Sequence, residues 1–431
     1  MIPFRALGAA LALLATAPSA DVKIAVAPDV ESGVYEPGKE ASWTVTVTGG
    51  DAPAAGKVAY VVRLGGLVEA ARGEAELKEG KARVAASRPD PGALLLEVRW
   101  RPPGASKDVT ALGGAVFAPD RIQPSAPPPD DFDAFWKGKI AELEAVPMNV
   151  QLEKVDAGDA SVEYFRITMD NIRGSKIRGQ IARPAGKSAL PAVLQVQWAG
   201  VYPLQRDWVL WQARSGWLAM NIIAHDLPID EKPEFYSEKS AKELKDYPGI
   251  GADDREKSYF LRMFLSCHRA VEYLAKRPDW DRKALAIHGG SQGGYQAIVT
   301  AGMHPAVTAM AASVPAGCDH TGKQARRAPG WPHWGGRAWQ GKDEAKLLQA
   351  ARYFDAMNFA PRVKCPALVG VGLIDTTCPP EGVIATFNQF KGPKKLVILP
   401  RAGHGGDAAA HKPYNSAFGP FLEEAKRGGR K

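Results

Sequence analysis

The segment of the chain most suited to chemistry is a glycine-rich turn around Ser291. Residues 289–293 read Gly-Gly-Ser-Gln-Gly, which is the pattern G-x-S-x-G. An apolar strand pattern at 284–287 precedes the turn, and a helix pattern without breakers follows it at 295–303. A strand-to-helix turn of this kind lifts a serine hydroxyl clear of the sheet and points the helix N-terminus at a developing oxyanion. The pattern therefore predicts that Ser291 is a nucleophile.

Serine needs a base, oriented by an acid, to become a good nucleophile. Asp375 ends an apolar strand pattern at 367–374, where the C-terminal edge of a parallel sheet forms a crevice. His404 lies between glycines in a loop after the last strand pattern. The chain order serine, acid, histidine is the one expected after this turn. We therefore predict a catalytic triad of Ser291, Asp375 and His404.

The oxyanion needs two backbone N–H donors, and the sequence indicates where they lie. One is the residue after the nucleophile, Gln292, and the other belongs to the loop after the third strand, at 197–202. Gly200 permits close approach of that loop. The second donor is Val201 or Tyr202, and the sequence leaves the choice open.

Other polar residues near these segments fit catalytic roles less well. His225 and Asp226 end an earlier strand and could line the crevice, but as a catalytic pair they have the wrong chain order. Asp407 is an alternative carboxylate that is more simply explained by solvation, and His288 is expected to pack below the turn. No His, Cys or Asp group has metal-ligand spacing, so we expect no metal and no cofactor.

Two cysteines are expected at the same edge of the sheet. Cys318 follows one strand pattern, and Cys378 lies three residues after Asp375. They form either a disulfide or two separate buried thiols, since free cysteine often packs as a small apolar residue.

Three tryptophans lie among proline and glycine between residues 326 and 339. Trp331, Trp334 and Trp339 follow a strand that should end at the catalytic edge. One interpretation is an irregular lid whose rings line the mouth of the pocket and suit sugar rings and a short acyl chain. The other is that these rings cover the core, because large aromatic side chains are mostly buried.

The elements that must hold these residues alternate between strand and helix from about residue 150 onward. The late strands are continuous apolar runs, which a parallel sheet covered on both faces requires. Strands are predicted at 162–169, 176–183, 192–197, 217–224, 284–288, 307–314, 367–374 and 395–399. Helices are predicted at 258–276, 292–303, 380–390 and 410–426. The fold class is α/β, with a doubly wound, mostly parallel sheet of the α/β-hydrolase type.

The N-terminal part of the chain has a different character. Residues 1–20 combine Arg5, an apolar run and small residues, which predicts a cleaved signal peptide and a periplasmic or secreted protein. Residues 21–119 show short alternating strands separated by turn residues and predict a small Ig-like β-sandwich. A proline-rich linker at 120–130 leads into the catalytic domain at 131–431.

Composition narrows the class of partner. The chain has 431 residues, of which 45% are hydrophobic and 24% charged, as in ordinary soluble proteins. Its charge of +8 is dispersed and shows no basic stripe with interleaved aromatics, which argues against nucleic-acid binding. No segment after the leader has a transmembrane pattern. The expected partner is a small-molecule or polysaccharide ester, and oligomerisation stays open.

Several motifs resemble the acetyl xylan esterase/cephalosporin C deacetylase family. The similar segments are 131–136, 289–294, 353–358, 362–364, 372–375, 379–380 and 403–404. The resemblance implies an α/β-hydrolase that deacetylates short-chain sugar esters, with Ser291 as nucleophile, Asp375 as acid and His404 as base. Two segments depart from the family pattern: Ala199-Gly200-Val201 replaces His-Gly-Tyr, and Ala224-His225-Asp226 replaces Arg-Gly-Gln. These departures leave the substrate and the oligomeric state open.

Two alternative functions compete with an esterase. A serine peptidase of the prolyl-oligopeptidase type also joins a β domain to a hydrolase fold, but its β domain is normally much larger and its turn commonly has tyrosine where this chain has Gln292. A non-catalytic binding protein on the same scaffold would be expected to lose a triad member, and this sequence retains all three.

Overall fold

The computed structural model describes residues 22–49, 55–103, 105–336, 339 and 341–428. The described N-terminal part contains eight strands in two sheets, in the orders β1-β3-β6 and β2-β8-β7-β4-β5. All pairs are antiparallel except β2–β8. The two sheets enclose a core around Trp43, whose indole N–H donates to the carbonyl of Gly114 at 3.2 Å. The predicted small β-sandwich is confirmed. The strands are β1 (Lys23–Pro28), β2 (Val34–Tyr35), β3 (Glu40–Thr48), β4 (Gly56–Leu64), β5 (Val68–Leu77), β6 (Lys81–Ser87), β7 (Gly92–Trp100) and β8 (Val109–Phe117).

The rest of the described chain is built on one nine-stranded sheet, in the order β17-β16-β15-β14-β12-β13-β11-β10-β9. The pairs from β13 to β17 are parallel, and β9, β10 and β11 join antiparallel at one end. The predicted mostly parallel sheet is thus confirmed. Its strands are β9 (Gln151–Val155), β10 (Val162–Asp170), β11 (Lys176–Pro184), β12 (Leu190–Val196), β13 (Leu218–Ile222), β14 (Trp280–Gly290), β15 (Ala309–Ser313), β16 (Ala367–Gly372) and β17 (Lys394–Leu399).

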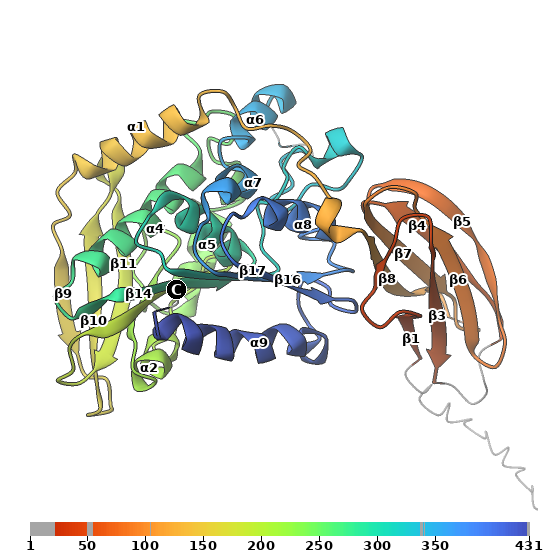
Figure 1. Cartoon of the computed structure of the whole chain (residues 1–431), viewed down its shortest axis with the longest axis horizontal. Helices are drawn as coiled ribbons and strands as arrows, with labels where there is room; N and C mark the ends of the chain where they lie inside the picture. Colours follow the sequence, from red (N-terminus) through yellow and green to blue (C-terminus); the bar gives the residue numbers. More distant parts are fainter. Residues whose placement is uncertain (1–21, 50–54, 104, 337–338, 340, 429–431) are drawn as a thin grey trace, which may run out of the picture.

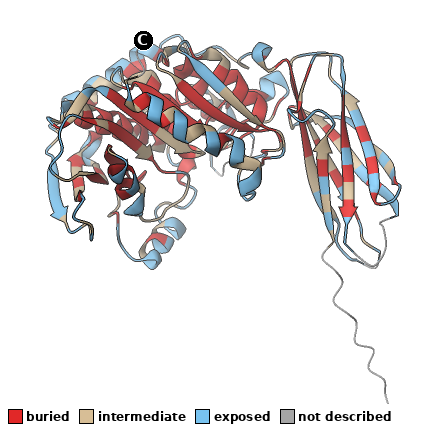
Figure 2. Cartoon of the chain, turned by 60° about the horizontal axis from the view of Figure 1, so that its bottom comes forward, coloured by how far each residue is buried: buried red, intermediate tan, exposed pale blue. Residues whose placement is uncertain are grey.

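Helices cover both faces of this sheet, with α1, α4, α5 and α8 on one side and α2 and α9 on the other (Figure 1). The central strands are accordingly buried along most of their length (Figure 2). The helices are α1 (Phe132–Glu144), α2 (Asp207–Arg214), α3 (Pro233–Ala241), α4 (Tyr259–Lys276), α5 (Gln292–Met303), α6 (Glu344–Ala351), α7 (Ala356–Phe359), α8 (Pro380–Gln389) and α9 (Ala408–Lys426). None of the described helices combines the length and the apolar character needed to cross a membrane.

The parallel strands bring the predicted functional residues to one edge of the sheet. β14 ends directly before Ser291, β16 ends three residues before Asp375, and β17 ends five residues before His404. β12 lies beside β14, so the loop that follows β12 borders the turn at Ser291. The predicted export segment, residues 1–20, lies outside the described residues.

The four cysteines are all free thiols, so the structure contains no Cys318–Cys378 disulfide. Both of these cysteines are about 1% exposed. The alternative of two separate buried thiols is the one that the structure supports.

Buried neutral histidines make the fold sensitive to acid. Burial lowers the pKa of His225 and His268 to about 4 and that of His320 to about 3. An unfolded histidine titrates near 6.5, so below that pH the unfolded chain binds more protons than the folded chain. We expect the free energy of unfolding to fall between pH 6.5 and 4, by on the order of 3 kcal/mol per histidine. Urea unfolding at several pH values measures this. His320→Gln should flatten the profile, whereas a constant stability from pH 7 to 5 would contradict the prediction.

Candidate active site

Ser291 sits in a strained turn held by three backbone hydrogen bonds. Its φ and ψ are 53° and −122°, a conformation that residues with a side chain rarely adopt. Its N–H donates to Ser313 at 2.9 Å, and its carbonyl accepts from Tyr295 and Ala316, both at 3.0 Å. These bonds fix the turn between β14 and α5, so the hydroxyl has a defined position.

Two glycines of the turn are required by close backbone approach. A Cβ on Gly289 would lie 2.5 Å from the carbonyl carbon of Gly293. A Cβ on Gly293 would lie 2.6 Å from the oxygen of Val196, at the end of β12. The G-x-S-x-G pattern therefore reflects how tightly the turn packs against itself and against the neighbouring strand.

Ser291, His404 and Asp375 form a continuous hydrogen-bonded series. Ser291 Oγ lies 2.8 Å from His404 Nε2, and His404 Nδ1 lies 2.8 Å from Asp375 Oδ2. The Asp375 side chain is fully buried, whereas that of His404 is 27% exposed. The carboxylate is thus shielded, while part of the imidazole is accessible. Both distances are within the normal hydrogen-bond range.

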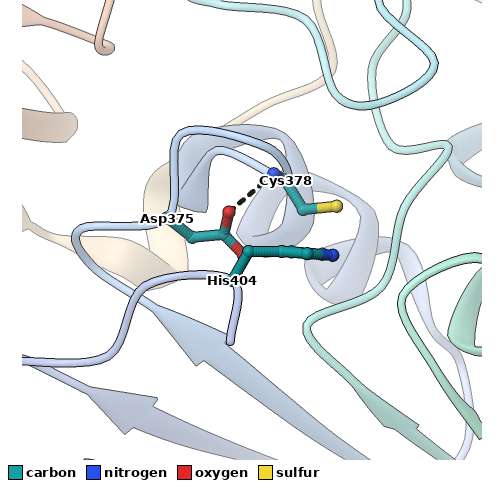
Figure 3. Close-up of side chains that lie close together, drawn as sticks. All are labelled: Asp375, Cys378 and His404. Carbon is teal, nitrogen blue, oxygen red and sulfur yellow. Dashed lines mark hydrogen bonds and ion pairs between the residues drawn. The ribbon is translucent and has the colours of Figure 1, made fainter. Parts of the chain in front are cut away.

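The carboxylate of Asp375 is locked by its second oxygen. Asp375 Oδ1 accepts the backbone N–H groups of Thr377 and Cys378, each at 2.8 Å. Figure 3 shows the carboxylate between Cys378 and the imidazole of His404. Because Oδ1 is held, Oδ2 is presented to Nδ1, which fixes the ring orientation and leaves Nε2 to face the serine.

Among the described residues, one group of side chains has ligand atoms that could surround a metal ion. It consists of Asp375, Cys378 and His404, whose ligand atoms all lie within 4.8 Å of one another. Burial raises the pKa of the Cys378 thiol well above its ordinary range, and the nearby Asp375 carboxylate adds to this rise. Metal ligands must be deprotonated, and a neutral thiol is a poor one. The hydrogen bonds of the carboxylate also occupy both of its oxygens. The group therefore fits an acid–base pair beside a buried thiol better than a metal centre.

The loop after β12 borders the serine turn and carries both predicted second donors. Among the described residues, no acceptor is bonded to the N–H of Val201 or of Tyr202, so either remains available to an oxyanion. Gln197, 1% exposed, fixes the loop: its Nε2 donates to the carbonyl of Tyr202 at 3.1 Å, and its Oε1 accepts from Ala224 N at 2.9 Å. The choice between Val201 and Tyr202 stays open.

The side chain of Gln292 has a structural task. It is fully buried, and its Oε1 accepts a short hydrogen bond from the hydroxyl of Tyr247. The part of Gln292 that could serve in the oxyanion site is therefore its backbone N–H, in the first turn of α5.

His225 also supports this loop, which the sequence did not predict. Its Nε2 lies 3.0 Å from the carbonyl of Gly200, and its Nδ1 lies 2.7 Å from the hydroxyl of Tyr259. The carbonyl can only accept, so the neutral ring donates through Nε2 and accepts through Nδ1. His225 thus holds Gly200, whose φ of 124° shapes the loop. The sequence feature that could have indicated this role is a histidine at the end of a strand, next to the loop after β12.

The remaining polar candidates are accounted for without catalysis. Asp407 caps α9 by accepting from Ala409 N at 2.8 Å. Asp226 accepts from Lys176 N and from the Arg178 side chain. His288 contacts Gln212 and the ring of Phe418, as expected for a packing residue.

The lid interpretation of the three tryptophans is wrong for Trp334. It is 1% exposed, and its indole N–H donates to the carbonyl of Pro248 at 2.9 Å, so it lies in the core and not at a pocket mouth. Trp339 is half-buried and packs against the core at Gly249. Trp331 is bonded to the segment that carries Asp375, because its N–H donates to the carbonyl of Thr377 at 2.9 Å, two residues after Asp375.

Trp331 is therefore expected to affect acyl-chain selectivity. Its ring lies 6.4 Å from that of Tyr247, which binds Gln292 next to the nucleophile. We expect wild-type protein to cleave p-nitrophenyl acetate far better than the butyrate. Trp331→Ala should reduce this ratio several-fold, because removal of the indole would leave more room for a longer acyl chain. Steady-state kinetics on both esters measures the ratio. Trp334→Phe, a change in the core, should keep it, and an unchanged ratio in Trp331→Ala would contradict the prediction.

Comparison with known proteins shows which family the chain is similar to. The model of the acetyl xylan esterase family (AXE1) matches residues 120–418. Acetyl esterase Axe7A of Xylanibacter ruminicola is 29% identical over 382 residues, which cover 88% of this chain and 85% of that protein.

Two solved acetyl xylan esterases share the fold. The enzyme from Paenibacillus sp. R4 is 24% identical, with a TM-score of 0.60 over 71% of this chain and 98% of the other. The enzyme from Thermoanaerobacterium sp. JW/SL YS485 is 19% identical, with a TM-score of 0.59 over 71% and 97%.

Proposed function

The chain belongs to the acetyl xylan esterase family and is a carboxylic-ester hydrolase, and we propose that it removes acetyl groups from carbohydrates through an acyl-enzyme on Ser291. The observation that carries the mechanism is the pair of 2.8 Å contacts that join Ser291, His404 and Asp375 in series. Membership of the family supports the ester chemistry, and the two contacts support the proposed roles of Ser291 as nucleophile, His404 as base and Asp375 as acid.

In the first step, His404 Nε2 takes the proton of Ser291 Oγ as this oxygen attacks the acetyl carbonyl carbon. The resulting oxyanion accepts the N–H of Gln292 and that of Val201 or Tyr202. Asp375 keeps the proton of His404 on Nδ1 and stabilises the imidazolium that forms. The imidazolium then gives its Nε2 proton to the departing sugar oxygen, which leaves an acetyl-serine.

In the second step, His404 Nε2 takes a proton from a water molecule, whose oxygen attacks the acetyl-serine. Collapse of the second tetrahedral intermediate returns the proton to Ser291 Oγ and releases acetate. The partial exposure of His404 is consistent with access of this water to the imidazole.

Two assays and one labelling experiment test the proposal. Release of acetate from acetylated xylan and turnover of p-nitrophenyl acetate are expected, with prolyl peptides inert. An organophosphonate should label Ser291, as located by mass spectrometry of the digested protein. Peptide cleavage would favour the prolyl-oligopeptidase alternative, and silence on all substrates would favour a binding protein.

A further inference from the structure

Four aromatic side chains lie on and beside the loop at 197–202, which we call the oxyanion loop. They form a surface whose side chains the proposed mechanism does not use, and we call it the aromatic platform. Trp198 stacks on Tyr202 at a centroid distance of 5.3 Å and an interplanar angle of 27°. Trp208 packs edge-on against Trp198 at 5.2 Å and lies 6.4 Å from Tyr202. Trp211 lies three residues further along α2, on the same helix face as Trp208.

The platform starts close to the catalytic serine. Trp198 follows Gln197, whose carbonyl oxygen lies 3.1 Å from the Cβ that an alanine at 293 would have, within the serine turn. Gln197 also accepts from Gln296 in α5 at 2.9 Å. The loop that carries Trp198 is thus packed against the serine turn, and the rings extend from it onto the first turns of α2.

The platform is exposed, and the geometry of its stacked pair is fixed. Trp198 and Trp211 are 46% and 58% exposed, and they are the two tryptophans among the exposed large apolar side chains of the described chain. The hydroxyl of Tyr202 donates to the carbonyl of Trp198 at 3.0 Å, which holds the stacked pair in place. Neither exposed ring is needed to fill the core.

We propose that the aromatic platform binds the pyranose rings of a polysaccharide backbone and so guides acetylated chain segments to Ser291. The inference rests on the proposed function and names the substrate class as polymeric. The C–H face of a pyranose ring is flat and apolar, which matches the exposed face of an indole. The hydroxyl groups at the ring edge need polar partners, and the exposed residues Arg206 and Asp207 lie between Tyr202 and Trp208 in the chain.

A second copy of the chain is a less suitable occupant. An aromatic side chain buries about 150–250 Å² when fully covered, so two half-exposed indoles together offer roughly 150–250 Å². A stable interface needs about 800 Å² from each partner. The area of the platform therefore suits a narrow sugar chain.

The test compares Trp211→Ala with a control at another exposed apolar residue far from the site. Trp211 is outside the oxyanion loop, so the variant should keep kcat/KM for p-nitrophenyl acetate within about twofold. On acetylated xylan, KM should rise about tenfold, and unacetylated xylan should bind about tenfold more weakly in affinity electrophoresis. Trp211→Tyr retains a flat ring and should recover part of the loss. Leu152→Ala, on β9 at 45% exposure, should behave as wild type.

The outcomes separate this inference from the proposed function. Unchanged KM and unchanged xylan binding in Trp211→Ala would overturn the platform while leaving the esterase intact. If the wild-type protein released no acetate but its xylan binding depended on Trp211, the platform would be supported and the esterase mechanism refuted. A change in sedimentation of Trp211→Ala without a change in xylan binding would identify the surface as a contact between copies and overturn the inference.

Discussion

Replacing Ser291 with alanine is expected to lower kcat for p-nitrophenyl acetate by about a million-fold, and His404→Ala by a similar factor. Ser291 Oγ and His404 Nε2 are 2.8 Å apart, and in the proposed mechanism the loss of either group leaves no activated nucleophile. Asp375→Asn should cost less, about ten-thousand-fold, because an amide at this position stabilises the wrong tautomer of the ring while nucleophile and base remain. Purified variants are compared by stopped and continuous ester assays.

Controls for this series come from the same loops. Asp407→Asn removes a carboxylate that caps α9, and it should retain near wild-type kcat. Circular dichroism and thermal unfolding should show that the three triad variants stay folded. Activity close to wild type in a cleanly purified His404→Ala protein would refute the assignment of the base, since no other described histidine contacts Ser291.

The sequence predicted most of the large sheet because its strands are distinct in composition. β15 and β16 are fully or almost fully buried, and such strands appear as continuous apolar runs that are easy to locate. The edge strand β9 was missed because it is exposed along most of its length and carries no apolar pattern. The short helices α2 and α3 were also missed: α2 has eight residues and leaves Trp211 58% exposed, and Tyr236 is the one buried residue of α3.

The site shows the same division between local and distant information. The turn at Ser291 and the strand end before Asp375 have local patterns, so their positions could be predicted. The support that His225 gives to Gly200 could not, because it joins residues from two different strand ends. The sequence left Trp334 either at a pocket mouth or in the core, because it could not show that the carbonyl of Pro248 accepts the indole N–H.

Glu381→Ala is expected to lower the free energy of unfolding by about 3–5 kcal/mol. Glu381, at the start of α8, is 3% exposed and lies where the β-sandwich meets the large sheet. Its Oε1 accepts from the backbone N–H of Ala93 and from the guanidinium of Arg88, and Arg327 Nη1 lies 3.8 Å from its Oε2. Alanine would leave a buried N–H without an acceptor and two guanidinium groups without this carboxylate.

Glu381→Gln separates the hydrogen bond to Ala93 from the charge, because it keeps an acceptor for the Ala93 N–H but removes the charge that faces Arg88 and Arg327. Its free energy of unfolding should lie between those of the wild type and Glu381→Ala. Glu238→Ala is the matched control, since Glu238 and Lys242 form an ion pair that is 59% and 67% exposed and should contribute less than about 1 kcal/mol. Urea unfolding followed by tryptophan fluorescence measures all three. If Glu381→Ala were as stable as Glu238→Ala, the buried cluster would not hold the β-sandwich to α8, and other contacts between the two parts of the chain, such as the 2.8 Å hydrogen bond from Ala328 N to the carbonyl of Gly65, would do so.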